Sequence, residues 1–243
     1  MQIYNLFSPN FDKKKRNKKD IKAIVIHYTG MQSERESLNR LCNLKSKVSS
    51  HFFIGKNGKV YNLVKENKTA WHAGKSCWSN FKNLNKNSIG IELANKGHEF
   101  GYTNFKKKQI LSLIMVIKMI IKKYKIEKKN VVAHSDIAPL RKMDPGEKFP
   151  WQLLAKKNIG IWYNVKKNLI KNYRKEKIDD KKEKTNFIKN LNKIGYCLPV
   201  NTKNKILYIK NLIAFQRHFR GELVNGILDK ECTVIAEKLS KNL

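Results

Sequence analysis

Two histidines and one aspartate stand out in the sequence because they lie where catalytic groups are commonly built. His27 is near the end of the apolar run KAIVIHY, and His134 ends a second run, NVVAH. Asp144 follows ten residues after His134, beyond a loop that contains proline and just before another proline, so its carboxylate can return to the histidine. Two imidazoles and one carboxylate form the ligand set of a catalytic zinc site, which keeps a fourth position for water.

The same spacing also fits a protein without a metal. Histidines at strand ends can be hydrogen-bonded rim residues, and Asp-Pro-Gly is an ordinary turn sequence. A local ligand pair such as HExxH is not present in the sequence. From the residue types and their spacing alone, both interpretations remain open.

Length and composition indicate a folded chain. The 243 residues, 41% of them hydrophobic and 10% aromatic, suffice for one large domain or two smaller ones. With 12 glycines and 5 prolines, collagen-like and proline-rich classes are excluded. The longest nearly apolar run, Ile110 to Ile121, is shorter than the roughly 20 residues of a membrane helix. We therefore expect no membrane span.

The net charge of +33 raises the prospect of an anionic partner. The lysines are spread along the whole chain, however, and accompany many Asn and Ile residues, so compositional drift explains the charge at least as well. Helix-turn-helix and zinc-finger spacings are missing from the sequence. We expect no nucleic-acid partner.

The cysteines and the first residues bear on the compartment. Cys42, Cys77, Cys197 and Cys232 show no CxxC pairing, which predicts four free thiols in a reducing compartment. A basic segment followed by an apolar stretch is not evident among the first twenty residues. The expected location is cytoplasmic.

Mixed strands with one dominant helix predict an α/β or α+β domain that ends near Trp162. The run Ser88 to Leu93 alternates, with Glu92 on the face opposite the core. Phe105 to Ile126 is predicted to be a long helix that packs across the sheet. The other expected elements are a helix within 33–42 and strands at 22–28, 51–54, 60–64 and 130–134.

The C-terminal part has a different character. The stretch KNYRKEKIDDKKEK (171–184) is almost entirely charged, which is typical of a linker or a solvated helix. Apolar periodicity resumes after it and predicts three helices, the last beginning near Asp229. The predicted division is therefore 1–165 for the catalytic domain, 166–185 for a charged linker and 186–243 for a small three-helix domain.

Five ordered sequence blocks carry a resemblance to a known family. IVIHYTG, SSHFFIGKNGKVYNLV, AWHAG, NSIGIELAN and HSDIAPLRKMDPG occur here in the order of the zinc-dependent N-acetylmuramoyl-L-alanine amidases of the amidase-2 family. The resemblance extends from about residue 8 to residue 162 and implies an α/β fold with a mixed central β-sheet flanked by helices. The tail words LIAFQRHFRG and NGILDKECTVIAEKL resemble the small peptidoglycan-binding module that AmiD-type members carry after the catalytic domain.

The resemblance implies specific roles in hydrolysis of the amide between N-acetylmuramic acid, possibly its 1,6-anhydro form, and L-alanine. It assigns one Zn²⁺ ion to His27, His134 and Asp144. The ion lowers the pKa of its water to about 7. Glu92 then accepts and later delivers a proton, and Lys142 helps the ion to stabilise the oxyanion.

Fewer sequence features support the substrate-binding residues than the metal ligands. Trp71 and His72 resemble pocket-wall residues of the family, although an aromatic core anchor beside a satisfied histidine fits equally well. Arg141 suits pairing with a carboxylate of the stem peptide, and it also suits an ordinary surface charge. The sequence departs from the usual tail pattern at Cys232, where Asp229 is expected to cap the last helix instead.

Two functions follow from the resemblance. The first is an amidase acting on peptidoglycan or muropeptides in wall turnover and recycling. The alternative is a recognition protein that grips the same fragments without cutting them. We expect a monomer. The tail module points to the periplasm or cell envelope as the alternative to the cytoplasm.

Overall fold

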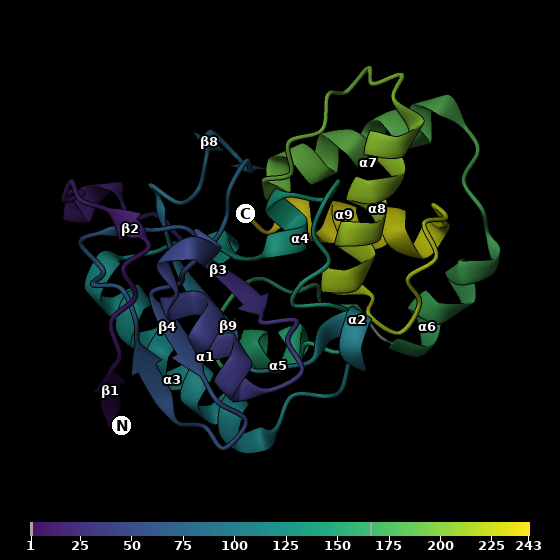
Figure 1. Ribbon diagram of the computed structural model, residues 1–243. Helices are drawn as coiled ribbons and strands as arrows, with labels where there is room; N and C mark the ends of the chain where they lie inside the picture. Colours follow the sequence, from purple (N-terminus) through teal and green to yellow (C-terminus); the bar gives the residue numbers. More distant parts are fainter. Residues whose placement is uncertain (1, 166) are drawn as a thin grey trace.

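The computed structural model describes residues 2–165 and 167–243 and has a six-stranded mixed sheet at its centre (Figure 1). The strand order is β1-β5-β4-β9-β3-β10. Four neighbouring strands, β4, β9, β3 and β10, run parallel, whereas β5 runs antiparallel to β4 and parallel to β1. The predicted fold class, a mixed sheet flanked by helices and followed by a helical region, is confirmed. These strands are β1 (Ile3–Asn5), β3 (Ala23–Tyr28), β4 (Phe52–Ile54), β5 (Val60–Asn62), β9 (Ser88–Leu93) and β10 (Val131–Ala133).

Strands β3 and β9 form the middle of the sheet and place two site residues side by side. Their register pairs His27 with Glu92. Side chains alternate between the two faces of a strand, so both residues point away from the face on which Ile26 and Ile91 are buried. The remaining elements of the first 165 residues are β2 (Phe11–Asp12), α1 (Glu34–Cys42), β6 (Thr69–Ala70), β7 (Cys77–Trp78), β8 (Phe81–Lys82), α2 (Gly97–Phe100), α3 (Lys107–Tyr124), α4 (His134–Ile137), α5 (Trp151–Lys156) and 3-10 turns at 18–20, 44–46 and 128–130.

Helix α3 covers one face of the sheet. Its apolar side contributes residues such as Leu113 and Ile117 to the core that holds Ile24 and Ile26 of β3. The amide of Gln109 fixes the first turn, because it donates to the carbonyl oxygens of residues 54 and 94 at the ends of two strands. The long helix predicted for 105–126 is confirmed with slightly shorter bounds.

The other face of the sheet packs against the C-terminal helices. Ala23 and Val25 of β3 share one hydrophobic core with Leu191, Phe215 and the rest of the helical region. Short helix α4 lies between the strands and α8 (Figure 1). The C-terminal part therefore packs directly onto the sheet. Its elements are α6 (Lys167–Asn172), a 3-10 turn at 173–175, α7 (Lys181–Ile194), α8 (Lys205–Phe219) and α9 (Lys230–Lys241).

The three predicted tail helices begin at side-chain caps. Asp180, Asn204 and Asp229 each accept a hydrogen bond from a backbone N–H in the first turn of α7, α8 and α9, respectively. Asp229 accepts from the N–H of Cys232, as expected from the sequence. The caps define where each helix starts.

The segment expected to be a charged linker is partly helical and in contact with the tail helices. It contains α6 and the first turns of α7, and Ile170 within it is buried. Arg174 forms ion pairs with Glu231 and Glu222. The division into domains at 165 and 185 stays a prediction.

A disulfide corrects the prediction of four free thiols. Cys77 and Cys197 are joined across 120 residues of sequence, whereas Cys42 and Cys232 are free. The prediction was wrong because the two cysteines become neighbours only when the tail docks beside the β7–β8 hairpin. Among the described residues, no helix has the length and hydrophobicity of a membrane span.

Removing the disulfide is expected to lower the free energy of unfolding by about 4 kcal/mol, since it closes a loop of more than 100 residues. Cys77→Ser tests this by denaturant unfolding, with Cys42→Ser as the control that leaves stability nearly unchanged. Thiol titration in denaturant without reductant should find two reactive groups per chain. Four would contradict the cross-link.

Candidate metal centre and its cleft

Three buried side chains meet at the carboxyl end of the central strands. His27 lies near the end of β3, His134 follows β10 directly as the first residue of α4, and Asp144 comes from the loop after α4. Nδ1 of His27 is 2.9 Å from Nδ1 of His134, and Oδ2 of Asp144 is 2.9 Å and 3.0 Å from these nitrogens. The three predicted ligands are thus brought together, as a group able to hold a metal ion.

The partners of the other ring nitrogens fix the tautomers of both histidines. Nε2 of His134 lies 3.1 Å from the carbonyl oxygen of Ala73, which accepts only, so this nitrogen carries the proton. Nε2 of His27 donates to Nδ1 of His72 at 3.1 Å. Each Nδ1 atom therefore presents a lone pair. When both rings are neutral, two such nitrogens and a carboxylate oxygen face one another, and a shared cation stabilises this arrangement.

The donor set and the spacing fit a divalent ion of the zinc type. Imidazole nitrogen and carboxylate oxygen are ordinary zinc ligands at about 2.0–2.2 Å, and atoms 2.9–3.0 Å apart can share one ion. The Nε2 hydrogen bonds supply the outer contacts that orient metal-binding histidines. His27, His134 and Asp144 would hold the ion.

His72 forms a hydrogen bond with His27 and also lines the cleft. After accepting from His27, its own Nε2 faces the hydroxyl of Ser88 at 3.3 Å, and this hydroxyl donates to the carbonyl of Leu84. Each hydrogen bond therefore donates in the same direction, from His27 to His72 to Ser88 and finally to the carbonyl oxygen of Leu84. Gly90 leaves the room for the ring, since a Cβ there would lie 2.4 Å from His72.

One carboxylate oxygen of Glu92, Oε2, is buried in the cleft and has no hydrogen-bond partner among the described residues. Burial, reinforced by the nearby charge of Asp144, raises the pKa of Glu92 well above its usual value. A carboxylate with a raised pKa beside a metal site is suited to exchange a proton near neutrality.

The pKa values of two predicted ligands, His27 and Asp144, are lowered. Burial lowers the pKa of His27 to about 4, with a further contribution from His134. Burial alone would raise the pKa of Asp144, but His134 and His27 hold it well below its usual range. His27 and Asp144 are therefore deprotonated at neutral pH, as metal binding requires.

The other predicted residues lie around the same opening. Lys142 is half-buried, and its charge lowers the pKa values of Glu92 and His27. Arg141 donates through Nε and Nη2 to carbonyl oxygens of residues 73 and 75, which leaves Nη1 without a partner among the described residues. Trp71 donates from Nε1 to Asp12 at 2.7 Å.

All eight residues predicted for the site line one cleft of about 600 Å³. The sequence interpretation missed Arg40 of α1 and Glu99 and Phe100 of α2, which also line it. No motif marks these positions, because they reach the cleft only through the packing of the helices around it.

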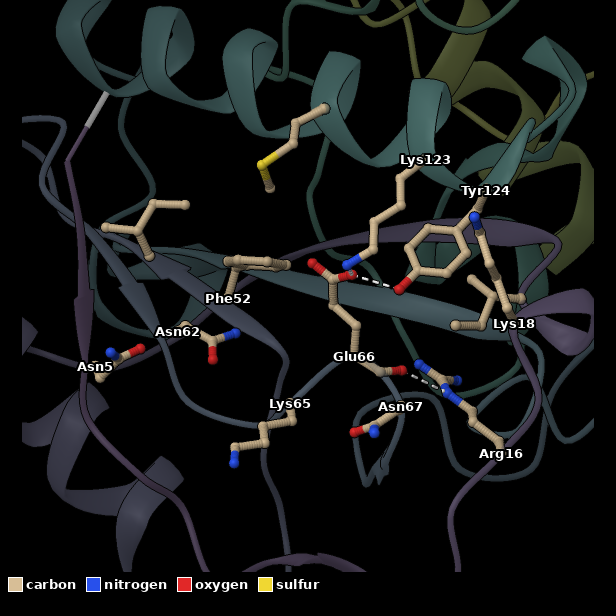
Figure 2. A pocket seen from close by; sticks show the side chains of 13 residues that line it. Asn5, Arg16, Lys18, Phe52, Asn62, Lys65, Glu66, Asn67, Lys123 and Tyr124 are labelled. Atoms are coloured by element: carbon tan, nitrogen blue, oxygen red, sulfur yellow. Dashed lines mark hydrogen bonds and ion pairs between the residues drawn. The ribbon is translucent and has the colours of Figure 1, made fainter.

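A second cavity, of about 530 Å³, lies between α3 and strands β1 and β5 (Figure 2). Lys123 and Tyr124 point toward the carboxylate of Glu66 and bond to it, and Phe52 forms part of the wall. Arg16 bonds to several backbone carbonyl oxygens. The residues that line this cavity include none of the predicted site residues.

Comparison with known proteins places the cleft in a family. The model of the Amidase_2 family, N-acetylmuramoyl-L-alanine amidase, matches residues 17–147, which include all three predicted metal ligands and both predicted catalytic residues. The chain belongs to this family. The predicted resemblance is confirmed.

Relatives extend the likeness beyond the family segment. The N-acetylmuramoyl-L-alanine amidase AmiD of Escherichia coli is 39% identical over 90% of this chain and 82% of that protein. The structure of E. coli AmiD with the substrate anhydro-N-acetylmuramic acid-L-Ala-D-gamma-Glu-L-Lys superposes with a TM-score of 0.80 and 35% identity, covering 95% of this chain and 92% of the other. The structure of AmpDh3 from Pseudomonas aeruginosa with anhydromuramic pentapeptide gives a TM-score of 0.81 at 31% identity, with 98% of both chains covered.

Gly90→Ala is expected to weaken metal binding by about tenfold or more, because the added Cβ displaces His72 from the His27 ring that it orients. Gly55→Ala is the matched control, since its Cβ meets mainly the mobile end of Glu34. Competition with a chromogenic chelator measures the affinity for Zn²⁺. Equal affinities for the two variants would argue against the orienting role of His72.

Proposed function

We propose that the chain hydrolyses the amide bond between N-acetylmuramic acid and L-alanine in peptidoglycan or muropeptides, with one Zn²⁺ ion as cofactor. The observation that carries this is the convergence of two imidazole nitrogens and a carboxylate oxygen beside Glu92, whose buried Oε2 has no partner among the described residues, in a cleft of an amidase-family chain. The activity serves the turnover and recycling of the cell wall.

The bound ion, Glu92 and Lys142 have different roles in the reaction. When bound, the ion supplies Lewis acidity to water and to the scissile carbonyl. Glu92 accepts a proton from the attacking water and delivers it to the leaving amine, which needs protonation because an amide anion leaves poorly. Lys142 faces the same cleft and stabilises negative charge on the carbonyl oxygen.

Substrate contacts follow from the groups that remain available. Nη1 of Arg141 is the group that pairs with a carboxylate of the stem peptide, because backbone carbonyl oxygens hold the rest of the guanidinium. The half-buried ring of Trp71 offers an apolar face to sugar or peptide. His72 lines the cleft and also orients His27.

The substrate form follows from the relatives. Two related amidases have been solved with anhydromuramyl peptides, which supports muropeptides of this kind as ligands of the present cleft. We propose the 1,6-anhydro form among the substrates, and a monomer as the active species. Binding of glycan by the C-terminal helices stays a prediction.

The disulfide favours an oxidising compartment. Disulfides form and persist in the periplasm and outside the cell and are rare in the cytosol. We infer from Cys77–Cys197 that the protein works in the periplasm or cell envelope, which was the alternative to the cytoplasmic expectation.

Catalysis is favoured over recognition alone by the state of Glu92. A pure binding protein gains nothing from the buried Oε2 of Glu92, which has no hydrogen-bond partner among the described residues, because burial of such an atom costs free energy. A hydrolase uses that group as its proton carrier.

Mass spectrometry of products tests the proposal directly. With zinc-loaded protein, anhydro-muropeptide should be split into the anhydro sugar and a peptide that begins with L-alanine. Glu92→Gln should lower turnover by about 10²–10⁴-fold while retaining the metal, because an amide cannot relay the proton. Normal turnover by this variant, or intact muropeptide with the wild type, would refute it.

The acid limb of kcat/KM is expected above pH 4.5, the ordinary pKa of glutamate. The deprotonated form of Glu92 is the active one, so activity is complete above its raised pKa and is lost as the pH falls through it. His27, with a pKa of about 4, is still neutral there.

Lys142→Met should move this limb to higher pH, because the lysine charge lowers the pKa of Glu92. Lys210→Met, at an exposed position of α8, is the control. Rate profiles from about pH 4 to pH 9 record the shift. An unmoved limb in Lys142→Met would assign it to another group.

A further inference from the structure

The end of helix α8 reaches two of the three segments that carry metal ligands. His218 contacts Asp136, which lies two residues after His134 in α4. The preceding residue, Arg217, lies 3.7 Å from Glu147, three residues after Asp144. Adjacent residues of the C-terminal helices thus contact the supports of two different ligands.

Asp136 is the centre of the first contact. It is 1% exposed, and its carboxylate has three partners. Oδ2 accepts from the backbone N–H of Ala133, at 2.8 Å, and from Nδ1 of His218, at 2.6 Å. Oδ1 accepts from the hydroxyl of Tyr196, at 2.7 Å. Two of the three donors belong to the C-terminal part, and the third opens the turn on which His134 sits.

Both C-terminal donors are held rigidly. The ring of His218 is stacked on Trp151 and on Phe219, with centroid distances of 3.8 Å and 4.1 Å. Tyr196 packs edge-on against Trp78 at 5.0 Å and precedes the disulfide-bonded Cys197. These contacts hold the two donors in position independently of their hydrogen bonds to the carboxylate.

The contact between Arg217 and Glu147 belongs to a chain of polar contacts near His27 and Asp144. Nε2 of His98 donates to Glu147 at 3.0 Å, and its Nδ1 accepts from the hydroxyl of Tyr28 at 2.8 Å. Tyr28 follows His27 directly in β3. Arg217 thus ends a chain of polar contacts that connects the segments of His27 and Asp144.

A buried carboxylate without donors is costly, and loss of the C-terminal donors would leave Asp136 with only the N–H of Ala133. We propose that Tyr196 and His218 are positioning residues, which hold the turn bearing His134 through Asp136 and make the C-terminal helices a structural part of the metal site. This inference rests on the proposed metal-dependent function.

The experiment compares variants of the full chain. Tyr196→Phe removes one hydroxyl and keeps the ring, and His218→Phe keeps the stacking and removes the donor. Each should weaken Zn²⁺ affinity, measured by chelator competition, by about tenfold. Each should also lower kcat while leaving KM nearly unchanged, because the cleft walls are not altered.

Two further variants separate positioning from general stability. His218→Asn retains a donor at the Nδ1 position and should recover part of the lost affinity. Tyr208→Phe removes a buried hydroxyl of α8 that has no partner among the described residues, and its Zn²⁺ affinity should equal that of the wild type.

The outcomes are distinct. A lower melting temperature in Tyr196→Phe and His218→Phe with unchanged Zn²⁺ affinity and kcat would overturn the inference. If His218→Phe does not fold, Tyr196→Phe and its control decide. A wild type that binds no Zn²⁺ would instead refute the proposed function on which the inference rests.

Discussion

Nδ1 of His27, Nδ1 of His134 and Oδ2 of Asp144 face one another at 2.9–3.0 Å, and lone pairs at that spacing repel unless a cation lies among them. Neighbouring groups and strands hold these three atoms in this arrangement. The carbonyl oxygen of Ala73 and Nδ1 of His72 accept hydrogen bonds from the Nε2–H groups of His134 and His27, respectively, and so fix both tautomers. The parallel strands bring the two histidines to the same end of the sheet.

Two carboxylates in the same cleft are driven to opposite protonation behaviour by their surroundings. The imidazoles hold the pKa of Asp144 low and keep it available as a ligand. Burial and the charge of Asp144 raise the pKa of Glu92 and prepare it to carry a proton. Such a separation of two carboxylates is how hydrolytic sites assign one to binding and the other to proton transfer.

Local features of this chain were predictable, whereas contacts between distant segments were not. The strands with His27 and Glu92 follow from β-branched and alternating runs, and the cap Asp229 follows from its place before a helix. The ligand triad was left open by spacing and became specific only through the family resemblance. The disulfide and the contacts of His218 with Asp136 depend on how the C-terminal helices dock, and no local pattern encodes that geometry.

The central claim is that one divalent ion is held by these three side chains. It is tested most directly by a crystal structure of the protein grown with zinc, with data collected on both sides of the zinc absorption edge. The account predicts one anomalous peak per chain in the cleft, about 2 Å from Nδ1 of His27, Nδ1 of His134 and a carboxylate oxygen of Asp144. An empty site at saturating zinc, or an ion bound through Nε2 of either histidine, would contradict it.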